Sequence, residues 1–167
     1  MPGDAADLAP RLRHADKQEI EALGEDCFSA LSESISAPGR AIAMLVDGKV
    51  TSLFGCSPMQ IGDGVVMGVI WMLASPTIYT CKSVFLRDAR KWLRDLTSGC
   101  QISGNVVDSR NTASKRWLAK LGYTFGRAIP INDNEFTEFY KHHVQPRSLG
   151  SNCNDRNVSD HAESRSK

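Results

Sequence analysis

The sequence lacks the residue patterns that hold metal ions or build disulfide frameworks. Its cysteines are odd in number and widely spaced, and neither a C-x-x-C nor an H-E-x-x-H pattern occurs. The five are Cys27, Cys56, Cys81, Cys100 and Cys153. Ligand sets and disulfide frameworks need closer or paired spacing. We therefore expect no metal site, and we expect the chain to work in a reducing compartment.

An excess of one charge and a long apolar run are also missing. The 20 Lys and Arg residues nearly balance the 19 Asp and Glu residues, which leaves a net charge of +1. This balance gives no electrostatic footprint for nucleic acid. No apolar run approaches the roughly 18 to 20 residues of a membrane helix, and the acidic, Ala-rich start does not resemble a signal peptide. We expect neither a nucleic-acid partner nor a membrane segment.

Composition predicts one domain with short flanking segments. Apolar residues make up 41% of the 167 residues, which is enough to build a core. From Gln145 onward Ser, Asn, Asp and Arg dominate, and such a segment buries too little apolar surface to become ordered. We expect a flexible N-terminus over residues 1–10, a single domain over residues 11–145 and a disordered tail over residues 146–167.

In the first half of the domain, the patterns predict a strand, a helix and three further strands. Arg11–His14 is a short strand candidate after a proline, and Asp16 with Glu19 resembles a capping box that opens a helix over Lys17–Leu31. The Asp47-Gly48 pair is typical of a hairpin turn. The strands expected around it and after it are Ala41–Val46, Lys49–Cys56 and Val65–Leu73.

In the second half, helices and strands alternate before a closing hairpin. Apolar spacing predicts helices over Val84–Leu96 and Asn111–Leu121, the second ended by Gly122. The expected strands are Ile102–Val107, Tyr123–Ile131 and Glu135–Val144. The order is thus β-α-β-β-β-α-β-α-β-β, which predicts a mixed α/β sheet with helices on both faces. Val65–Leu73 and Ile102–Val107 should be parallel neighbours, because a helix connects them.

This element order resembles the fold of GNAT N-acetyltransferases. The closest local match lies in the segments Asn111–Ser114, Trp117-Leu118 and Lys120–Tyr123. GNAT proteins have a similar run, from an Asn after the fifth strand to a Gly-aromatic pair that opens the sixth. The resemblance implies a GNAT-like acyl-CoA N-acyltransferase fold.

A narrower resemblance covers roughly residues 71–140. It rests on a Trp-containing strand, a Phe-Leu-Arg helix that ends in Trp92-Leu93, and a closing strand with Phe136 and Phe139. Between them lie Asn105–Val107, Asn111-Thr112 and Arg116–Leu118. This pattern resembles the internal virion protein A family of short-tailed phages. It implies a late, virion-associated role in the host bacterial cytoplasm or the virion, with phage or host proteins as partners.

The GNAT resemblance implies acetyl-CoA as cofactor, but two of the family's signatures differ here. The phosphate-binding turn before the third helix corresponds to Ser75–Ser83, which has no glycine and contains Pro76. The Tyr that protonates the leaving thiolate corresponds to Leu118, which cannot act as an acid. Hydroxyls and a cation in the loop offer another way to bind phosphate. The candidate cofactor-binding residues are Leu73, Ser75, Thr80, Asn111 and Ser114, and no catalytic residue is assigned.

Several residues allow two interpretations. Asn111 either contacts the cofactor or caps the helix that it opens, and Asp108 is either a base or a turn residue. The cations Lys82, Arg87, Arg90, Lys91 and Arg94 form either a phosphate-binding stripe or a solvated face. Two functions follow: a phage assembly protein with degenerate catalytic motifs, or an active acetyl-CoA-dependent N-acetyltransferase acting on a host or phage amine.

Overall fold

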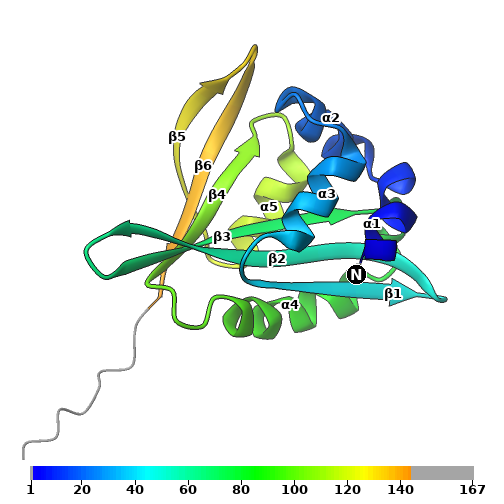
Figure 1. The fold of residues 1–167 in the computed structure, drawn as a ribbon, viewed down its shortest axis with the longest axis horizontal. Coiled ribbons are helices and arrows are strands. Elements are labelled where there is room, and N and C mark those ends of the chain that lie inside the picture. Colours follow the sequence, from blue (N-terminus) through cyan, green and yellow to red (C-terminus); the bar gives the residue numbers. More distant parts are fainter. Residues whose placement is uncertain (1, 144–167) are drawn as a thin grey trace, which may run out of the picture.

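The computed structural model describes residues 2–143, which form one six-stranded sheet with helices on both faces (Figure 1). The strand order is β1-β2-β3-β4-β6-β5. All neighbouring pairs are antiparallel except β3 and β4, which are parallel. The predicted mixed α/β sheet is therefore confirmed. The tail expected to be disordered, residues 146–167, lies outside the described residues.

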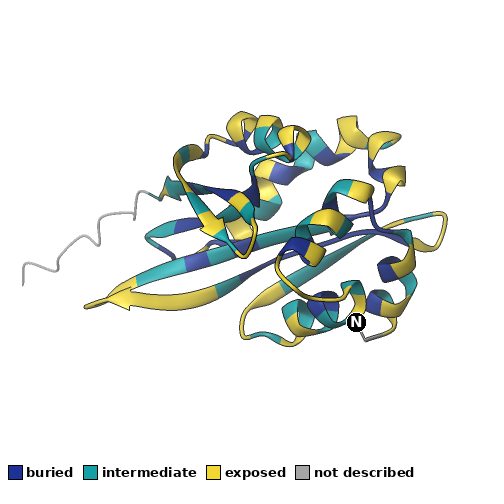
Figure 2. Ribbon diagram, turned by 90° about the horizontal axis from the view of Figure 1, so that it is seen from above, coloured by how far each residue is buried: buried dark blue, intermediate teal, exposed yellow. Residues whose placement is uncertain are grey.

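The strands follow from the alternation and turn signals of the sequence. They are β1 (Arg40–Val46), β2 (Lys49–Gly62), β3 (Val65–Ala74), β4 (Ile102–Asp108), β5 (Thr124–Ile131) and β6 (Asn134–His142). The β1–β2 turn places Asp47 and Gly48 at positive φ, as an Asp-Gly hairpin turn requires. Strand β2 is longer than predicted, because Pro58 pairs within the ladder and the chain turns only after Gly62. The tip of the β2–β3 hairpin therefore extends, exposed, beyond the body of the molecule (Figure 2).

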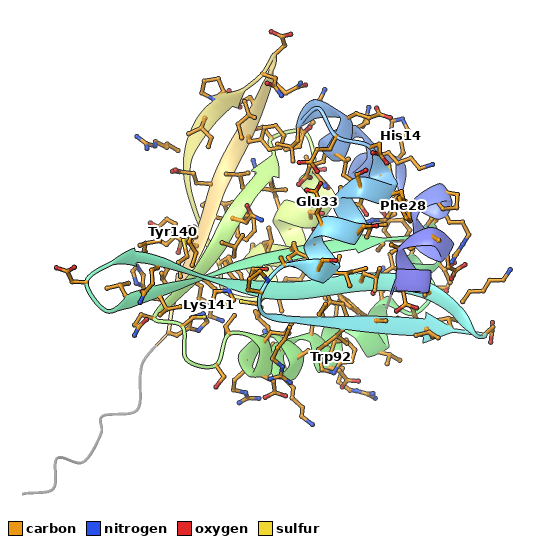
Figure 3. All side chains as sticks on the ribbon, in the orientation of Figure 1. His14, Phe28, Glu33, Trp92, Tyr140 and Lys141 are labelled. Atoms are coloured by element: carbon orange, nitrogen blue, oxygen red, sulfur yellow. The ribbon has the colours of Figure 1, made fainter. Side chains whose placement is uncertain are left out.

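The helices divide into two groups. They are α1 (Pro2–Leu8), α2 (His14–Ala22), α3 (Cys27–Ser36), α4 (Lys82–Leu96) and α5 (Thr112–Lys120), with short 3-10 helices η1 (Ala9–Arg11) and η2 (Pro76–Tyr79). One core lies where α1–α3 meet the sheet around Leu8, Leu31 and Leu53. The other lies where α4 and α5 meet the opposite face around Phe54 and Phe85. Figure 3 shows Phe28 and Glu33 extending from α3 on one side of the sheet and Trp92 from α4 on the other.

The structure corrects the prediction for the N-terminal residues. Residues 2–8, expected to be flexible, form α1, and the strand expected at Arg11–His14 is absent. The reason is an apolar stripe with helical spacing, which is buried against α3 and β2. Its members are Ala5, Leu8, Ala9 and Leu12. Only Arg13 meets the sheet as a strand would, by donating its backbone N–H to the Ala74 carbonyl at 2.8 Å.

The single helix expected over Lys17–Leu31 is two helices. Gly24 lies between them with φ +84°, a conformation that ends α2. The cap of α3 is Asp26, whose carboxylate accepts from the backbone N–H groups of Phe28 and Ser29, each at 3.0 Å. Asp16 and Glu19, expected to form a capping box, instead bond to residues outside the helix: Asp16 to Ala74 of β3 and Glu19 to Asn111.

Candidate functional site

Strands β3 and β4 separate partway along their length. They pair at only three positions, from Met67 with Ile102 to Val69 with Gly104, which confirms the predicted parallel neighbours. Beyond these pairs each strand continues without the other, β3 to Ala74 and β4 to Asp108 (Figure 1). A parallel sheet opened in this way exposes backbone groups and leaves a gap that side chains from both faces can line.

A cavity of about 320 Å³ occupies this opening. One wall comes from the α2–α3 side and includes Glu19, Ile20, Leu23, Trp71 and Leu73. The other comes from the α4–α5 side and includes Phe54, Phe85, Trp92, Trp117 and Leu118. Because these residues lie on opposite faces of the sheet, the cavity passes through it. Its size falls in the range of small-molecule sites, which is about 300–1,000 Å³.

Helix α2 bridges the open end of the gap. Toward β3, the Asp16 carboxylate accepts from the Ala74 backbone N–H at 2.9 Å and from the Arg13 guanidinium at 2.6 and 2.9 Å. Toward β4, the Glu19 carboxylate accepts from Asn111 Nδ2 at 3.2 Å. The helix is thus tied to the ends of both separated strands, and these contacts fix Glu19 at the cavity wall.

The environment of Glu19 changes its acidity. The pKa of its carboxyl is raised from the ordinary 4.5 to about 7, chiefly by burial and also by the nearby negative charge of Asp16. The hydrogen bonds from Asn111 and from the Asp108 backbone act in the opposite direction. A carboxylate with a pKa near neutrality accepts a proton far more readily than an ordinary glutamate does. Glu19 is therefore the candidate general base of this cavity.

The open edge of β3 presents a backbone peptide group to the cavity. Backbone groups of alternate residues point to the same edge of a strand, so Ile70, Met72 and Ala74 all face the gap. The Ile70 carbonyl accepts from Asn105 Nδ2 at 3.0 Å, and both backbone groups of Ala74 are bonded to Asp16 and Arg13. The N–H and carbonyl of Met72, between them, face the cavity. They can pair with an extended ligand as a neighbouring strand would.

Aromatic side chains close the α4–α5 side of the cavity. The Phe85 ring lies 4.7 Å from the Trp117 ring and 5.6 Å from the Trp92 ring, and Phe54 lies 5.4 Å from Trp92, measured between centroids. The indole Nε1 of Trp117 is buried and has no hydrogen-bond partner in the described part of the chain. A buried N–H is rarely left unpaired, so this donor is available to a ligand.

The structure brings together three of the five predicted cofactor-binding residues. Leu73, Asn111 and Ser114 line the cavity. Ser75 does not, because it is buried and its hydroxyl donates to the Thr51 carbonyl at 3.2 Å. Thr80 is exposed, and its hydroxyl donates to the Thr77 carbonyl at 2.8 Å. The Ser75 hydroxyl thus bonds the backbone of β2, and the Thr80 hydroxyl bonds the backbone of its own loop.

The loop from residue 75 to residue 83 folds into η2 and then enters α4. Cys81 is the N-cap of α4, and its side chain makes no capping hydrogen bond to the first turn. Its sulfur instead contacts the carbonyls of Thr77 and Ile78 at 3.5 and 3.6 Å. The first turn of α4, which begins with Lys82, therefore keeps N–H groups that can bind an anion although the loop has no glycine.

Leu118 and Asp108, two positions that the sequence analysis considered for catalysis, have structural roles. Leu118 is buried in the core between α5 and the sheet. Asp108 is buried and its carboxylate bonds Arg110 at 2.6 Å, which holds its pKa below the usual range. It also accepts from the Arg110 backbone N–H at 2.8 Å, the geometry of a turn residue. Asp108 is thus paired with Arg110, and its lowered pKa disfavours a function as a general base.

Asn111 serves both as a helix cap and as a contact of Glu19. Its Oδ1 accepts from the Ser114 backbone N–H at 3.1 Å, while its Nδ2 donates to Glu19. Asn111→Ala should lower the free energy of unfolding by about 1–2 kcal/mol, the usual cost of losing a cap. It should also raise the pKa of Glu19, because a hydrogen bond that lowers this pKa is lost.

Urea unfolding and an NMR titration of the Glu19 carboxyl measure the two effects of Asn111→Ala. Thr112→Ala, at the adjacent exposed position, is the control and should change neither quantity appreciably. A pKa of Glu19 that stays the same in Asn111→Ala would show that the contact has no electrostatic effect.

Glu19 and Asn105 are the functional candidates that sequence reasoning missed. Glu19 was interpreted as part of a cap, and its partner Asn111 lies 92 residues away in sequence. No local pattern can reveal such a pair. Apolar positions at Ile20 and Leu23, which also line the cavity, marked the inward face of α2 and could have placed Glu19 at its border.

Two other features are absent from the part of the chain that the structure describes. Within residues 2–143, no group of three or more His, Cys, Asp or Glu side chains could hold a metal ion. Among the helices of the same residues, none is long and apolar enough to cross a membrane.

Comparisons with known proteins identify the fold. No family model and no curated protein sequence matches the chain. An aminoglycoside 6′-acetyltransferase type Ii matches with a TM-score of 0.65 and 16% identity, over 87% of this chain and 94% of that one. The GNAT acetyltransferase from Streptococcus pneumoniae matches with a TM-score of 0.55 and 18% identity, over 84% of this chain and 94% of that one. The aminoglycoside acetyltransferase AAC(6')-Ib, in complex with ribostamycin and coenzyme A, matches with a TM-score of 0.62 and 13% identity, over 85% of this chain and 89% of that one. The chain therefore has the GNAT acetyltransferase fold.

Proposed function

We propose that the protein is an acyl-CoA-dependent N-acyltransferase in which Glu19 accepts the proton of an amine substrate. The observation that carries this proposal is the position of Glu19, with a pKa of about 7, at the wall of a cavity that passes through the sheet. A cavity lined from both faces of the sheet can bring a donor and an acceptor together at one carboxylate. That arrangement suits a direct transfer between two substrates.

The described residues fit the donor in three places. The Met72 peptide group can pair with the amides of the coenzyme A arm, and Trp117 Nε1 is a buried donor without a partner. The uncapped first turn of α4, with Lys82, suits the phosphates. When bound, acyl-CoA would supply an acyl group activated as a thioester. The coenzyme A in the AAC(6')-Ib structure supports this choice of donor.

The acceptor side of the cavity is acidic. Arg13 balances the charge of Asp16, but Glu19 and Glu25 also line this side, so it favours a cationic substrate such as a primary ammonium. An ammonium must lose a proton before its nitrogen can attack a carbonyl carbon. Glu19 takes that proton, and Asn111 holds the carboxylate in place while it does so. As the C–N bond forms, the thioester C–S bond would break and coenzyme A would leave as a thiolate, which the second proton released by the nitrogen would balance through solvent. Leu118 has no proton to donate, so we assign no general acid to α5.

A second candidate is a binding protein without catalysis, including a role in phage virion assembly with phage or host proteins as partners. Two observations favour it. Leu118 is buried where the general acid of GNAT enzymes is expected, and the loop before α4 is a 3-10 turn that starts at Pro76. A protein that kept the fold and lost the reaction would show these changes.

Acetyl-CoA binding tests the proposed donor site. At a hundredfold excess over its dissociation constant, acetyl-CoA should stabilise the protein by about 2.7 kcal/mol and raise the melting temperature by several degrees. Ser114→Trp should remove this stabilisation, because Ser114 lines the cavity and a bulky ring there fills it. Arg116→Trp, at an exposed position of the same helix, is the matched control and should keep it.

Differential scanning calorimetry with and without acetyl-CoA measures these shifts. Stabilisation that disappears in Ser114→Trp and persists in Arg116→Trp supports the donor site. No stabilisation of the wild-type chain favours the binding-protein candidate. Equal stabilisation of all three proteins would place the cofactor outside the cavity and contradict the proposal.

A further inference from the structure

The amide of Asn105 lies at the point where β3 and β4 separate. Its Nδ2 donates to the Ile70 carbonyl of β3 at 3.0 Å. Its Oδ1 accepts from the backbone N–H of the next residue, Val106, at 2.8 Å. Both bonds are part-buried, and Asn105 itself lines the cavity.

The two groups that Asn105 holds are natural partners of each other. In a parallel ladder one residue bonds to two residues of the facing strand, spaced two apart. With Val69 paired to Gly104, the ladder bond that would follow joins the Val106 N–H to the Ile70 carbonyl. The side-chain amide therefore occupies the place of the first ladder bond that is missing. Both backbone groups stay satisfied while the strands are apart.

We propose that Asn105 is the positioning residue that keeps the sheet open and so maintains the acyl-donor site. The statement that the open sheet forms an acyl-donor site rests on the proposed function, whereas the role of Asn105 in keeping the strands apart does not. By replacing one ladder bond with two bonds through its own amide, Asn105 stops the pairing before Met72. The Met72 peptide group then faces the cavity and is available to a ligand.

The chemistry of the position explains why an amide is required. The Ile70 carbonyl needs a donor and the Val106 N–H needs an acceptor, and a carboxamide carries both on one rigid plane. An aspartate could accept from Val106 but would place a negative oxygen against the Ile70 carbonyl. A valine offers neither group, so the two backbone groups would have to bond to each other or stay unpaired.

Asn105→Val and Asn105→Asp test the role of the amide, and Asn105→Gln tests whether a longer amide restores it. Thr97→Val is the matched control, because it removes one side-chain bond to a backbone carbonyl, from Thr97 to Leu93 at 2.9 Å, and Thr97 itself does not line the cavity. Two quantities are measured for each protein. They are the dissociation constant of acetyl-CoA by calorimetry and the exchange rate of the Met72 amide hydrogen by NMR.

We expect Asn105→Val to slow exchange of the Met72 amide, because the strands pair further along, and to weaken acetyl-CoA binding by about tenfold or more. Asn105→Asp should weaken binding similarly without protecting Met72, because it repels the Ile70 carbonyl. Asn105→Gln should stay closer to wild type than either, and Thr97→Val should match wild type in both measurements.

Other outcomes would overturn the inference. Unchanged exchange of Met72 in Asn105→Val would show that the amide does not keep the strands apart, whatever happens to binding. Equal losses of affinity in Thr97→Val and Asn105→Val would show a general effect on stability. If wild-type protein fails to bind acetyl-CoA, the proposed function fails, and the exchange rates still decide the role of Asn105. If Asn105→Val does not fold, Asn105→Asp and Asn105→Gln still separate the outcomes.

Discussion

Glu19→Gln is expected to make the protein more stable at alkaline pH and much less active. The folded state raises the pKa of Glu19 from 4.5 to about 7, which means that it disfavours the ionised carboxylate. Each pKa unit corresponds to about 1.4 kcal/mol, so ionised Glu19 destabilises the fold by on the order of 3 kcal/mol above pH 7. A neutral glutamine avoids this cost and still accepts from Asn111. Loss of a general base typically lowers the rate by about 10²- to 10⁴-fold.

The pH dependence of the stability gain identifies its cause. A group whose pKa is raised on folding contributes stability below its unfolded pKa, and that stability is lost as the pH rises through the folded pKa. The advantage of Glu19→Gln should therefore be small near pH 4.5, grow up to about pH 7 and then stay constant. Thermal unfolding from pH 4.5 to 8.5 measures it.

Glu21→Gln is the matched control, because Glu21 is an exposed residue of the same helix. It should change neither the stability at alkaline pH nor the activity. A stability difference between Glu19→Gln and wild type that does not vary with pH would contradict the assignment of a raised pKa to Glu19.

Asp16→Ala is expected to cause the largest loss of stability. Asp16 is buried with the Arg13 guanidinium, and it also accepts from the Ala74 N–H at the end of β3. Its removal leaves Arg13 as a buried charge without this partner. Breaking a buried ion pair on one side typically costs about 3–5 kcal/mol. Because these bonds also tie α2 to β3, the substitution should loosen the helix that carries Glu19.

Urea unfolding at neutral pH measures the effect of Asp16→Ala. The control is Asp88→Ala, which removes the partner of Arg87 from an ion pair on the surface of α4. Surface pairs contribute little, so the control should leave stability nearly unchanged. A loss in Asp16→Ala as small as in Asp88→Ala would show that the Arg13–Asp16 pair does not fix α2.

Most of the fold could be predicted from residue 40 onward. There the Asp-Gly turn, the Gly122 cap and the apolar periodicity act within a few residues, and the strands and helices of that region lie near their predicted bounds, except that β2 runs on to Gly62. The N-terminal part was harder because two signals compete. Pro10 and the short run after it suggested a strand, whereas the helical stripe from Ala5 to Leu12 decides the structure because it is buried.

The site was less predictable than the fold because it is made by contacts distant in sequence. Asn111 and its role as a helix cap were found from the local motif, but its contact with Glu19, 92 residues away, was not. The hydroxyls of Ser75 and Thr80 looked suited to a phosphate, but the first bonds a carbonyl of β2 and the second a carbonyl of the loop. Asn105 belonged to the run that suggested the fold, and nothing in sequence shows that its amide replaces a ladder bond.

The pH dependence of acetyl transfer tests the central claim most directly. Transfer of labelled acetyl from acetyl-CoA to a panel of primary amines, including a polyamine, a lysine peptide and an aminoglycoside, is measured from pH 5.5 to 8.5. The account predicts that kcat/KM for an accepted amine rises with pH through an apparent pKa near 7, and that Glu19→Gln is slower by at least about a hundredfold. Equal rates for the two proteins, or no transfer to any amine by a chain that binds acetyl-CoA, would contradict it.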